Sequence, residues 1–280
     1  MTTVTDLTKM VNGVRAVVLW ERDINEGQLS EAELAFQAQD NAGNVWNLGE
    51  YPEEYENGKF IGAPSTWIAG LARAEPGNLM LAEPREGAPE YLQGWAPEVD
   101  FLDCAKVFMA QQKTCVPASC YENVLVTDER SPLDPGSGHQ RKYYAPGVGN
   151  VQVGAVGDPE GETLVLVEVT RLSADALAEA RQEALKLEKN AYEGNALYRQ
   201  TSPAEQASVA QGPVGGQVAQ ASPSPHGDQG VAPQGGAPTA ERGTAPRGLP
   251  VRPLLLGVVA VALLGVGVLL VLRRRGRRAG

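Results

Sequence analysis

The chain has 280 residues, is 42% hydrophobic and carries a formal net charge of −10, which is ordinary for a globular protein. The charge is uneven: residues 273–280 hold five arginines and residues 193–252 are balanced, so residues 1–192 carry −15. Nucleic acid and anionic lipid headgroups repel such a region, and we therefore exclude nucleic acid as a partner.

Residues 1–50 predict an antiparallel meander. The pairs Asn-Gly at 12–13 and Glu-Gly at 26–27 are turn signals between strand-like segments. Apolar and polar residues then alternate, with Leu34 and Phe36 on one face and Glu33 on the other. We therefore expect strands with one apolar face and one face in water.

Residues 51–100 look irregular. Glu53, Glu54 and Glu56 could suggest a metal site, but the spacing of an EF-hand is absent and an Asn-Gly turn follows, which favours a solvated loop. Trp67 and Trp95 are interpreted as anchors that tie this loop to the sheet.

Strand-like sequence returns over residues 100–172, and a helix is predicted over residues 173–192. Ser173 is a good N-cap for this helix. Its apolar stripe of small residues predicts close packing on the sheet and comprises Leu177, Ala180, Ala184, Leu187 and Ala191. The expected fold is mainly β: an antiparallel sheet, as a sandwich or a half-barrel, with one packed C-terminal helix.

The C-terminal third predicts a different organisation. Residues 193–252 are rich in Pro, Gly, Ala and Gln, which is typical of a disordered linker. Residues 253–272 then predict a transmembrane helix, because 254–272 contain no charge and no hydrogen-bonding side chain. The organisation is thus an acidic head (1–192), a linker (193–252), one membrane span (253–272) and a basic tail (273–280).

The tail predicts the orientation, because short basic flanks stay in the cytoplasm. Its arginines are Arg273, Arg274, Arg275, Arg277 and Arg278. We expect a single-pass protein of the cell membrane with a cytoplasmic C-terminus and an extracytoplasmic head.

Export of the head requires a signal, and residues 1–23 show no signal-peptide pattern. The true start could lie upstream, the chain could be tail-anchored, or the span could translocate the head unaided. We favour an upstream start, because tail-anchoring carries the arginines across the membrane and unaided export of so large a domain is rare.

The chain contains three cysteines, and an extracytoplasmic domain can form a disulfide between two of them. Cys115 and Cys120 bracket a proline-containing turn and are the favoured disulfide, with Cys104 bonded to either of them as the rival arrangement.

No residue pattern predicts catalysis, a metal or a cofactor. The head contains one histidine, His139, which leaves little scope for a Cys–His or Ser–His–Asp arrangement, and zinc-ligand spacing is absent. The glycine run at 147–154 lacks the Lys-Ser/Thr ending of a phosphate loop and is better explained as a bend between strands.

Two blocks resemble a known group of proteins: GNVWNLGE at 43–50 and KYYAPGVG at 142–149. They are similar to GNVWxxGE and KYYAPGVG motifs in exported bacterial proteins of unassigned function. The resemblance covers roughly residues 2–190. It implies a secreted, mainly antiparallel β head without known catalytic residues, and further β sequence upstream of residue 1.

Two classes of function follow. The favoured one is a non-catalytic module that binds another component of the bacterial cell envelope. The alternative is a carrier or sensor of an apolar ligand, similar to periplasmic lipoprotein-carrier folds; an enzyme is third. Five aromatic residues would line the carrier's cavity or else pack in the core: Trp20, Phe36, Trp46, Tyr143 and Tyr144.

Overall fold

The computed structural model describes residues 1–157, 161–207 and 268–274. The strands are β1 (Thr2–Val11), β2 (Val14–Asn25), β3 (Gln28–Gln39), β4 (Val45–Glu56), β5 (Lys59–Gly62), β6 (Trp67–Ile68), β7 (Glu75–Met80), β8 (Tyr91–Ala96), β9 (Phe101–Val116), β10 (Ser119–Arg130), β11 (His139–Ala145), β12 (Gly149–Val156), β13 (Leu164–Arg171), β14 (Glu205–Gln206) and β15 (Val268–Arg274). One α-helix, α1 (Ala174–Gly194), and three short 3₁₀ turns, at Pro97–Val99, Pro135–Ser137 and Tyr198–Gln200, complete the described elements.

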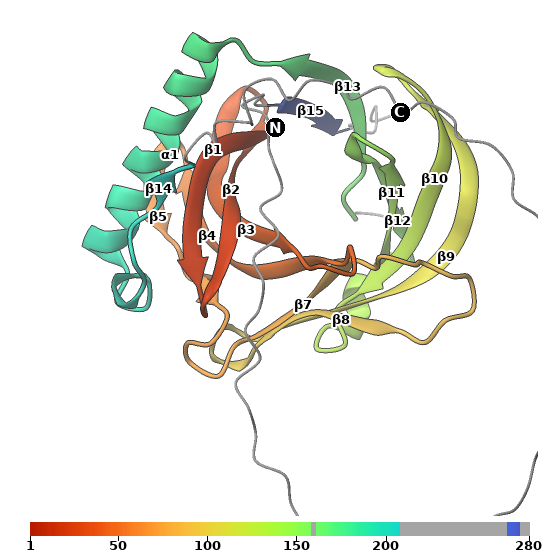
Figure 1. The fold of residues 1–280 in the computed structure, drawn as a ribbon, viewed down its shortest axis with the longest axis horizontal. Coiled ribbons are helices and arrows are strands. Elements are labelled where there is room, and N and C mark those ends of the chain that lie inside the picture. The colour runs from red at the N-terminus through yellow and green to blue at the C-terminus, as the bar shows by residue number, and fades with distance from the viewer. Residues whose placement is uncertain (158–160, 208–267, 275–280) are drawn as a thin grey trace, which may run out of the picture. The chain divides into compact units, whose positions relative to one another are not determined.

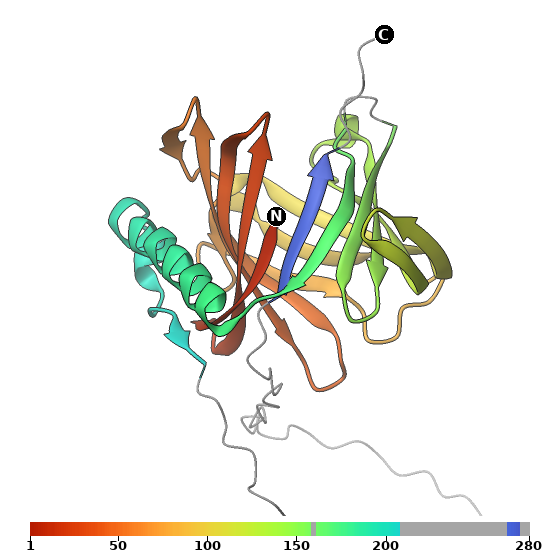
Figure 2. The same cartoon turned by 90° about the horizontal axis from the view of Figure 1, so that it is seen from above.

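All described strands belong to one antiparallel sheet. Its order is β14-β1-β15-β13-β12-β11-β10-β9-β8-β7-β4-β3-β2, and β1 also pairs with β2. The sheet curves strongly, so that β2 and β3 face β11 and β12 across its concave side (Figure 1). The helix lies outside this curve, against β1 and β3 (Figure 2). The expected antiparallel sheet with one packed helix is confirmed.

The predicted turns at residues 12–13 and 26–27 are present in the structure. Residues 12–13 and 26–27 adopt positive φ at the tips of the β1–β2 and β2–β3 hairpins. Residues 51–100 are less irregular than expected, since they contain the end of β4 and all of β5 to β8. Glu53 is also not solvated: it is 1% exposed and accepts hydrogen bonds from Tyr51 (2.9 Å) and Tyr55.

The main core lies between the convex face of the sheet and α1. Ser173 caps the helix by accepting a hydrogen bond from the Ala176 amide (3.2 Å). The predicted stripe is buried in full: Leu177, Ala180, Ala184, Leu187 and Ala191. From the sheet, Leu34 and Phe36 of β3 belong to the same core, as the alternation in β3 predicted.

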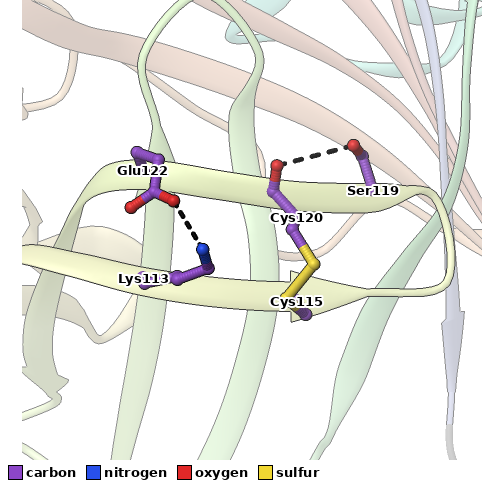
Figure 3. Close-up of a disulfide and its surroundings, with 5 residues drawn as sticks. All are labelled: Lys113, Cys115, Ser119, Cys120 and Glu122. Atoms are coloured by element: carbon purple, nitrogen blue, oxygen red, sulfur yellow. Dashed lines mark hydrogen bonds and ion pairs between the residues drawn. A yellow bond between two sulfur atoms is a disulfide. The ribbon is translucent and has the colours of Figure 1, made fainter.

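A second, smaller core lies beneath the β9–β10 hairpin and comprises Val124, Ala145, Val151 and Leu166. Cys115 and Cys120 are directly paired residues near the tip of this hairpin and form a disulfide (Figure 3). Cys104 is free. The favoured cysteine pairing is therefore confirmed.

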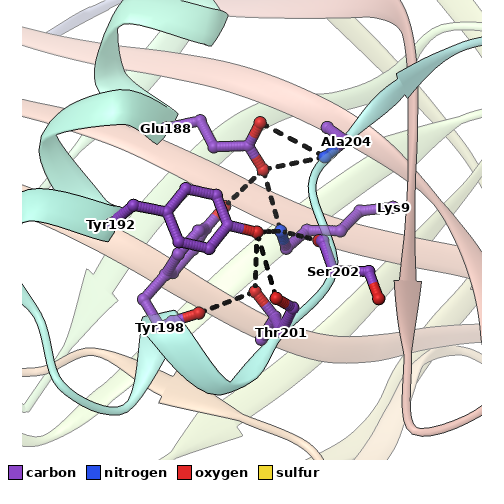
Figure 4. Close-up of polar contacts among 7 residues, drawn as sticks. All are labelled: Lys9, Glu188, Tyr192, Tyr198, Thr201, Ser202 and Ala204. Atoms are coloured by element: carbon purple, nitrogen blue, oxygen red, sulfur yellow. Dashed lines mark hydrogen bonds and ion pairs between the residues drawn. The ribbon is translucent and has the colours of Figure 1, made fainter.

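A buried ion pair joins the helix to the sheet. Lys9 of β1 is completely buried, and its Nζ lies 2.8 Å from Oε1 of Glu188 on α1 (Figure 4). Lys9 also donates to the hydroxyl of Tyr192 (3.0 Å) and to the carbonyl of Ser202 (2.6 Å). Glu188 also accepts from the backbone N–H of Ala204 (3.0 Å). One cluster therefore fastens α1 and the segment after it to β1.

This cluster revises the start of the linker. Residues 193–207, which the composition assigned to the linker, pack on the head, and Tyr198 is fully buried there against Phe36 and Tyr51. The physical reason is that the burial of Tyr198 and the hydrogen bonds of Ser202 and Ala204 to Lys9 and Glu188 stabilise this segment on the head. Its composition, which is poor in apolar residues, does not reveal these contacts. Residues 208–252 lie outside the described residues.

Most of the expected membrane segment, up to residue 267, also lies outside the described residues. Its last five residues are part of β15, which pairs with β1 and β13. Within the described ranges, the structure contains no helix that is both long and apolar enough to cross a bilayer. The membrane span therefore stays a prediction.

We predict that Lys9→Met lowers the free energy of unfolding by about 3–5 kcal/mol, because it leaves the carboxylate of Glu188 buried without its cation. Lys113→Met is the matched control. It breaks the exposed pair of Lys113 with Glu122 (2.7 Å), and such pairs contribute at most about 1 kcal/mol. Urea unfolding of both variants checks the difference. Equal, small losses would contradict the role given to Lys9.

Candidate functional site

The concave face of the sheet carries charged side chains where a packed sheet would carry apolar ones. Six carboxyl groups on this face come from β2, β3, β4, β9 and β10: Glu21, Glu31, Glu33, Glu50, Asp103 and Glu129. All of them except the buried Glu129 retain intermediate solvent exposure. Lys142 of β11 belongs to the same face. We call these seven residues the concave cluster.

The pairing of the strands brings three of these carboxyl groups together. Glu21 lies directly opposite Glu33, and Glu50 lies opposite Ala35, two residues along β3 from Glu33. Directly opposite residues have Cβ atoms about 5 Å apart, and diagonal neighbours remain within reach of long side chains. Glu21, Glu33 and Glu50 therefore form one acidic group across three adjacent strands.

The cluster also extends across the curve of the sheet. Burial raises the pKa of Glu21, whereas the amino group of Met1, a hydrogen bond from Thr2 and the charge of Lys142 act in the opposite direction. Glu21 and Lys142 lie on β2 and β11, which are far apart in the order of the sheet. They therefore face each other across the concave side.

One carboxyl group of the cluster is paired. Oε2 of Glu129 lies 2.8 Å from Nζ of Lys142, and Oε1 accepts hydrogen bonds from Thr127 (2.6 Å) and Tyr144 (3.1 Å). Burial raises the pKa of Glu129, but the charge of Lys142 and these hydrogen bonds outweigh burial and lower it. Glu129 is therefore ionised although it is buried.

Two other carboxyl groups of the concave cluster, Glu33 and Glu50, have raised pKa values instead. Among the described residues, no ion pair includes Glu21, Glu33 or Glu50. Burial, and then the neighbouring charges of Glu50, Glu21 and Glu31, raise the pKa of Glu33 well above its ordinary value. Burial is likewise the main cause that raises the pKa of Glu50, to about 7. Glu33 and Glu50 resist ionisation because they are buried beside other carboxyl groups and no cation pairs with them.

An indole N–H lies beside Glu50. Trp67 of β6 is directly opposite Glu50 and is 1% exposed, and it stacks on Phe101 with ring centroids 5.1 Å apart. Its N–H interacts with the Glu50 carboxyl closely enough to lower the pKa of Glu50, yet Nε1 makes no hydrogen bond of normal geometry. A Cβ atom at position 94 would lie 2.7 Å from the Phe101 ring and 3.1 Å from the Trp67 ring, so Gly94 favours this stack.

The five aromatic residues named from the sequence do not line a common cavity. Phe36 is in the main core, and Trp20 and Trp46 pack against it. Tyr143 packs against the second core, and Tyr144 joins the concave cluster through Glu129. Core packing thus describes four of the five.

The residues considered for catalysis lie elsewhere. His139 Nδ1 is 2.6 Å from Asp128 Oδ1, on the face opposite to Lys142. Burial and the charge of Glu90 raise the pKa of Cys104, which disfavours its thiolate. The glycine run at 147–154 lies in the β11–β12 turn and in β12, as the bend between strands that was expected. In the described ranges, His, Cys, Asp and Glu nowhere converge on a point where a metal ion could bind.

One shallow pocket of about 330 Å³ lies outside the concave cluster, at the C-terminal end of α1. It includes the exposed side chains of Phe60 and Ile61 from β5. Nothing in the structure indicates what would cover these two residues.

The comparisons with known proteins do not assign a family. No protein-family model, no curated protein and no solved structure matches the chain.

We predict an unusual pH dependence of stability. Because the pKa of Glu50 is about 7 in the folded protein and ordinarily 4.5, the folded state binds more protons than the unfolded state between these values. The stability from protonated Glu50 is fully present below pH 4.5 and is lost as the pH rises through about 7. We expect the free energy of unfolding to fall by about 2–3 kcal/mol between pH 5 and pH 8.

The variant Glu50→Gln should be more stable than the wild type at pH 8 and should flatten this dependence. Glu56→Gln, at the exposed end of the same strand, changes the net charge equally and serves as the control. Denaturant unfolding at several pH values measures all three proteins. A wild type that is most stable at pH 8 would contradict the prediction.

Proposed function

We propose that the chain is a non-catalytic binding module of the bacterial cell envelope, which takes its ligand against the concave face of the sheet. The observation that carries this proposal is the set of unpaired carboxyl groups from Glu21, Glu33 and Glu50 on that face. A face that served only for packing would be apolar, because burying a charge without a partner is unfavourable. Groups held in this state are characteristic of binding sites.

The two blocks that carry the sequence resemblance support the same location. GNVWNLGE ends at Glu50 in β4, and KYYAPGVG begins at Lys142 in β11. Both blocks therefore contribute a charged residue to the concave cluster, although they are almost a hundred residues apart. Within the described residues, no nucleophile hydrogen-bonds to His139, which gives an enzyme less support.

Membrane anchoring is the second part of the proposal, and its support comes from the sequence. The uncharged run 254–272 is long enough to span a bilayer and the arginines follow it directly. Pairing of residues 268–272 in β15 is the alternative for this segment. Retention of the full chain in membranes after a carbonate wash distinguishes the two, since a chain anchored by a membrane helix is not released.

A carrier of an apolar ligand, the alternative function, has less support. Its cavity would need apolar walls, whereas carboxyl groups from five strands lie on the concave face. We therefore propose that polar groups of the concave face recognise the ligand.

We predict that occupying the concave face abolishes ligand binding. The full chain is mixed separately with putrescine, citrate and indole, and its melting temperature is followed by circular dichroism. At least one probe should raise it by several degrees, since a ligand that binds only the folded state stabilises it. Ala35→Trp, directly opposite Glu50 and two residues from Glu33 on β3, should remove the shift.

Gln28→Trp, at the exposed start of the same strand, is the matched control and should keep the shift. If Ala35→Trp does not fold, Gln37→Trp tests the same face two residues further along β3. Failure of all three probes to stabilise the wild type, or an equal shift in the concave-face variant, would contradict the proposed function.

A further inference from the structure

The chemistry of the concave cluster identifies the ligand class that it would accept. The question is which group could sit among Glu21, Glu33 and Glu50 and relieve their mutual repulsion. The structure itself contains one answer, because Glu129 on the same face has such a partner.

Glu129 and Lys142 show what an ammonium group does on this face. Glu129 is 5% exposed, so its burial is severe, yet its pKa is lowered because Lys142 lies 2.8 Å away and hydrogen bonds add to the effect. Glu33 and Glu50 have no such partner and their pKa values are raised. An added ammonium group would lower the pKa values of Glu33 and Glu50 in the same way and favour their ionised forms.

The arrangement disfavours a metal ion as this partner. A divalent cation needs several oxygen atoms within 2.0–2.6 Å, roughly, of one point. Across the part of the chain that the structure describes, the acidic side chains do not converge in this way. An ammonium group instead donates three separate hydrogen bonds over longer distances, which suits carboxyl groups on three neighbouring strands.

Trp67 provides an independent indication of a ligand. Its indole N–H is buried, is aimed at Glu50 and lacks a proper hydrogen bond. A buried donor without an acceptor is unfavourable. If a cation on the other side of Glu50 stabilised its carboxylate form, that carboxylate would accept a full hydrogen bond from Trp67.

We propose that the concave face binds a primary ammonium group between the carboxylates of Glu33 and Glu50, with Glu21 beside them and Trp67 donating to Glu50. This inference rests on the proposed function, because it assigns the ligand class of the same site. The shared chemistry is the ammonium group, which could belong to a free diamine or to a lysine side chain of a protein partner.

Binding should release protons, because the cation favours the ionised form of groups that are partly protonated in the free protein. The charged groups that act on Glu33 or Glu50 are Glu21, Glu31 and Asp103. The amino group of Met1, Lys142, Glu129 and Glu162 act in turn on these three or on each other, so they belong to the same linkage. If one carboxyl group with a pKa of about 7 must lose its proton, affinity should fall about 30-fold from pH 8 to pH 5.5.

The test is isothermal titration calorimetry of the full chain with putrescine, and separately with Nα-acetyl-lysine methylamide. Titrations at pH 6.5 in two buffers of different ionisation heat count the protons that binding releases. We expect binding with proton release at pH 6.5 and almost none at pH 9. Glu50→Gln and Glu33→Gln should each weaken binding at least tenfold, roughly the loss of one charge-assisted hydrogen bond, and Glu50→Gln should abolish most of the proton release.

Glu56→Gln is the matched control, because it removes one exposed negative charge from the same strand as Glu50. Equal weakening by Glu56→Gln and Glu50→Gln would reveal general attraction to an acidic protein and would overturn the proposal. Equal binding of Mg²⁺ would overturn it as well. Binding of citrate or indole without putrescine would refute the ammonium ligand but leave the binding module intact, whereas no binding of any probe would refute both.

Discussion

The structure depends on a difference in polarity between the two faces of one curved sheet. Where α1 packs on β1 and β3, the convex face is mainly apolar and supplies the main hydrophobic core. The concave face holds Glu21, Glu33 and Glu50 close together, and Glu33 and Glu50 have no cation paired with them. Folding of this chain must therefore tolerate carboxyl groups that are half-buried and mutually repulsive, and the burial of the convex face provides the free energy for it.

The same chain pairs its charges elsewhere. Lys9 and Glu188 form a fully enclosed ion pair whose remaining hydrogen bonds go to tyrosine hydroxyls and to the backbone. Glu129 has Lys142, Thr127 and Tyr144 as partners. Buried charges are paired and hydrogen-bonded in these two places, so the carboxyl groups of Glu33 and Glu50, which have no ion-pair partner, are a specific property of one surface. This contrast is the physical basis for treating that surface as the functional one.

Local patterns in the sequence predicted the fold well and the site poorly. Turn residues at 12–13, the alternation in β3 and the helical stripe after Ser173 each act through neighbours in the chain, so their outcome could be predicted. Alternation also placed Glu33 opposite to Leu34 and Phe36, as observed. It could not show that this polar face is concave and shielded from bulk water, because the curvature arises from the pairing of strands far apart in sequence. For the same reason Glu50, Asp103 and Lys142 gave no signal as a group, and a composition poor in apolar residues hid the docking of Tyr198.

The central claim is that Glu33 and Glu50 lack a neutralising partner in the free protein, and the titration of Glu50 tests it most directly. The side-chain carboxyl carbons of glutamate can be followed by ¹³C NMR as a function of pH, with Glu50→Gln used to assign the signal of Glu50. The account predicts that Glu50 titrates with a midpoint of about 7. A midpoint near the ordinary value of 4.5 would show that water or an unrecognised partner already satisfies this carboxylate, and would contradict the account.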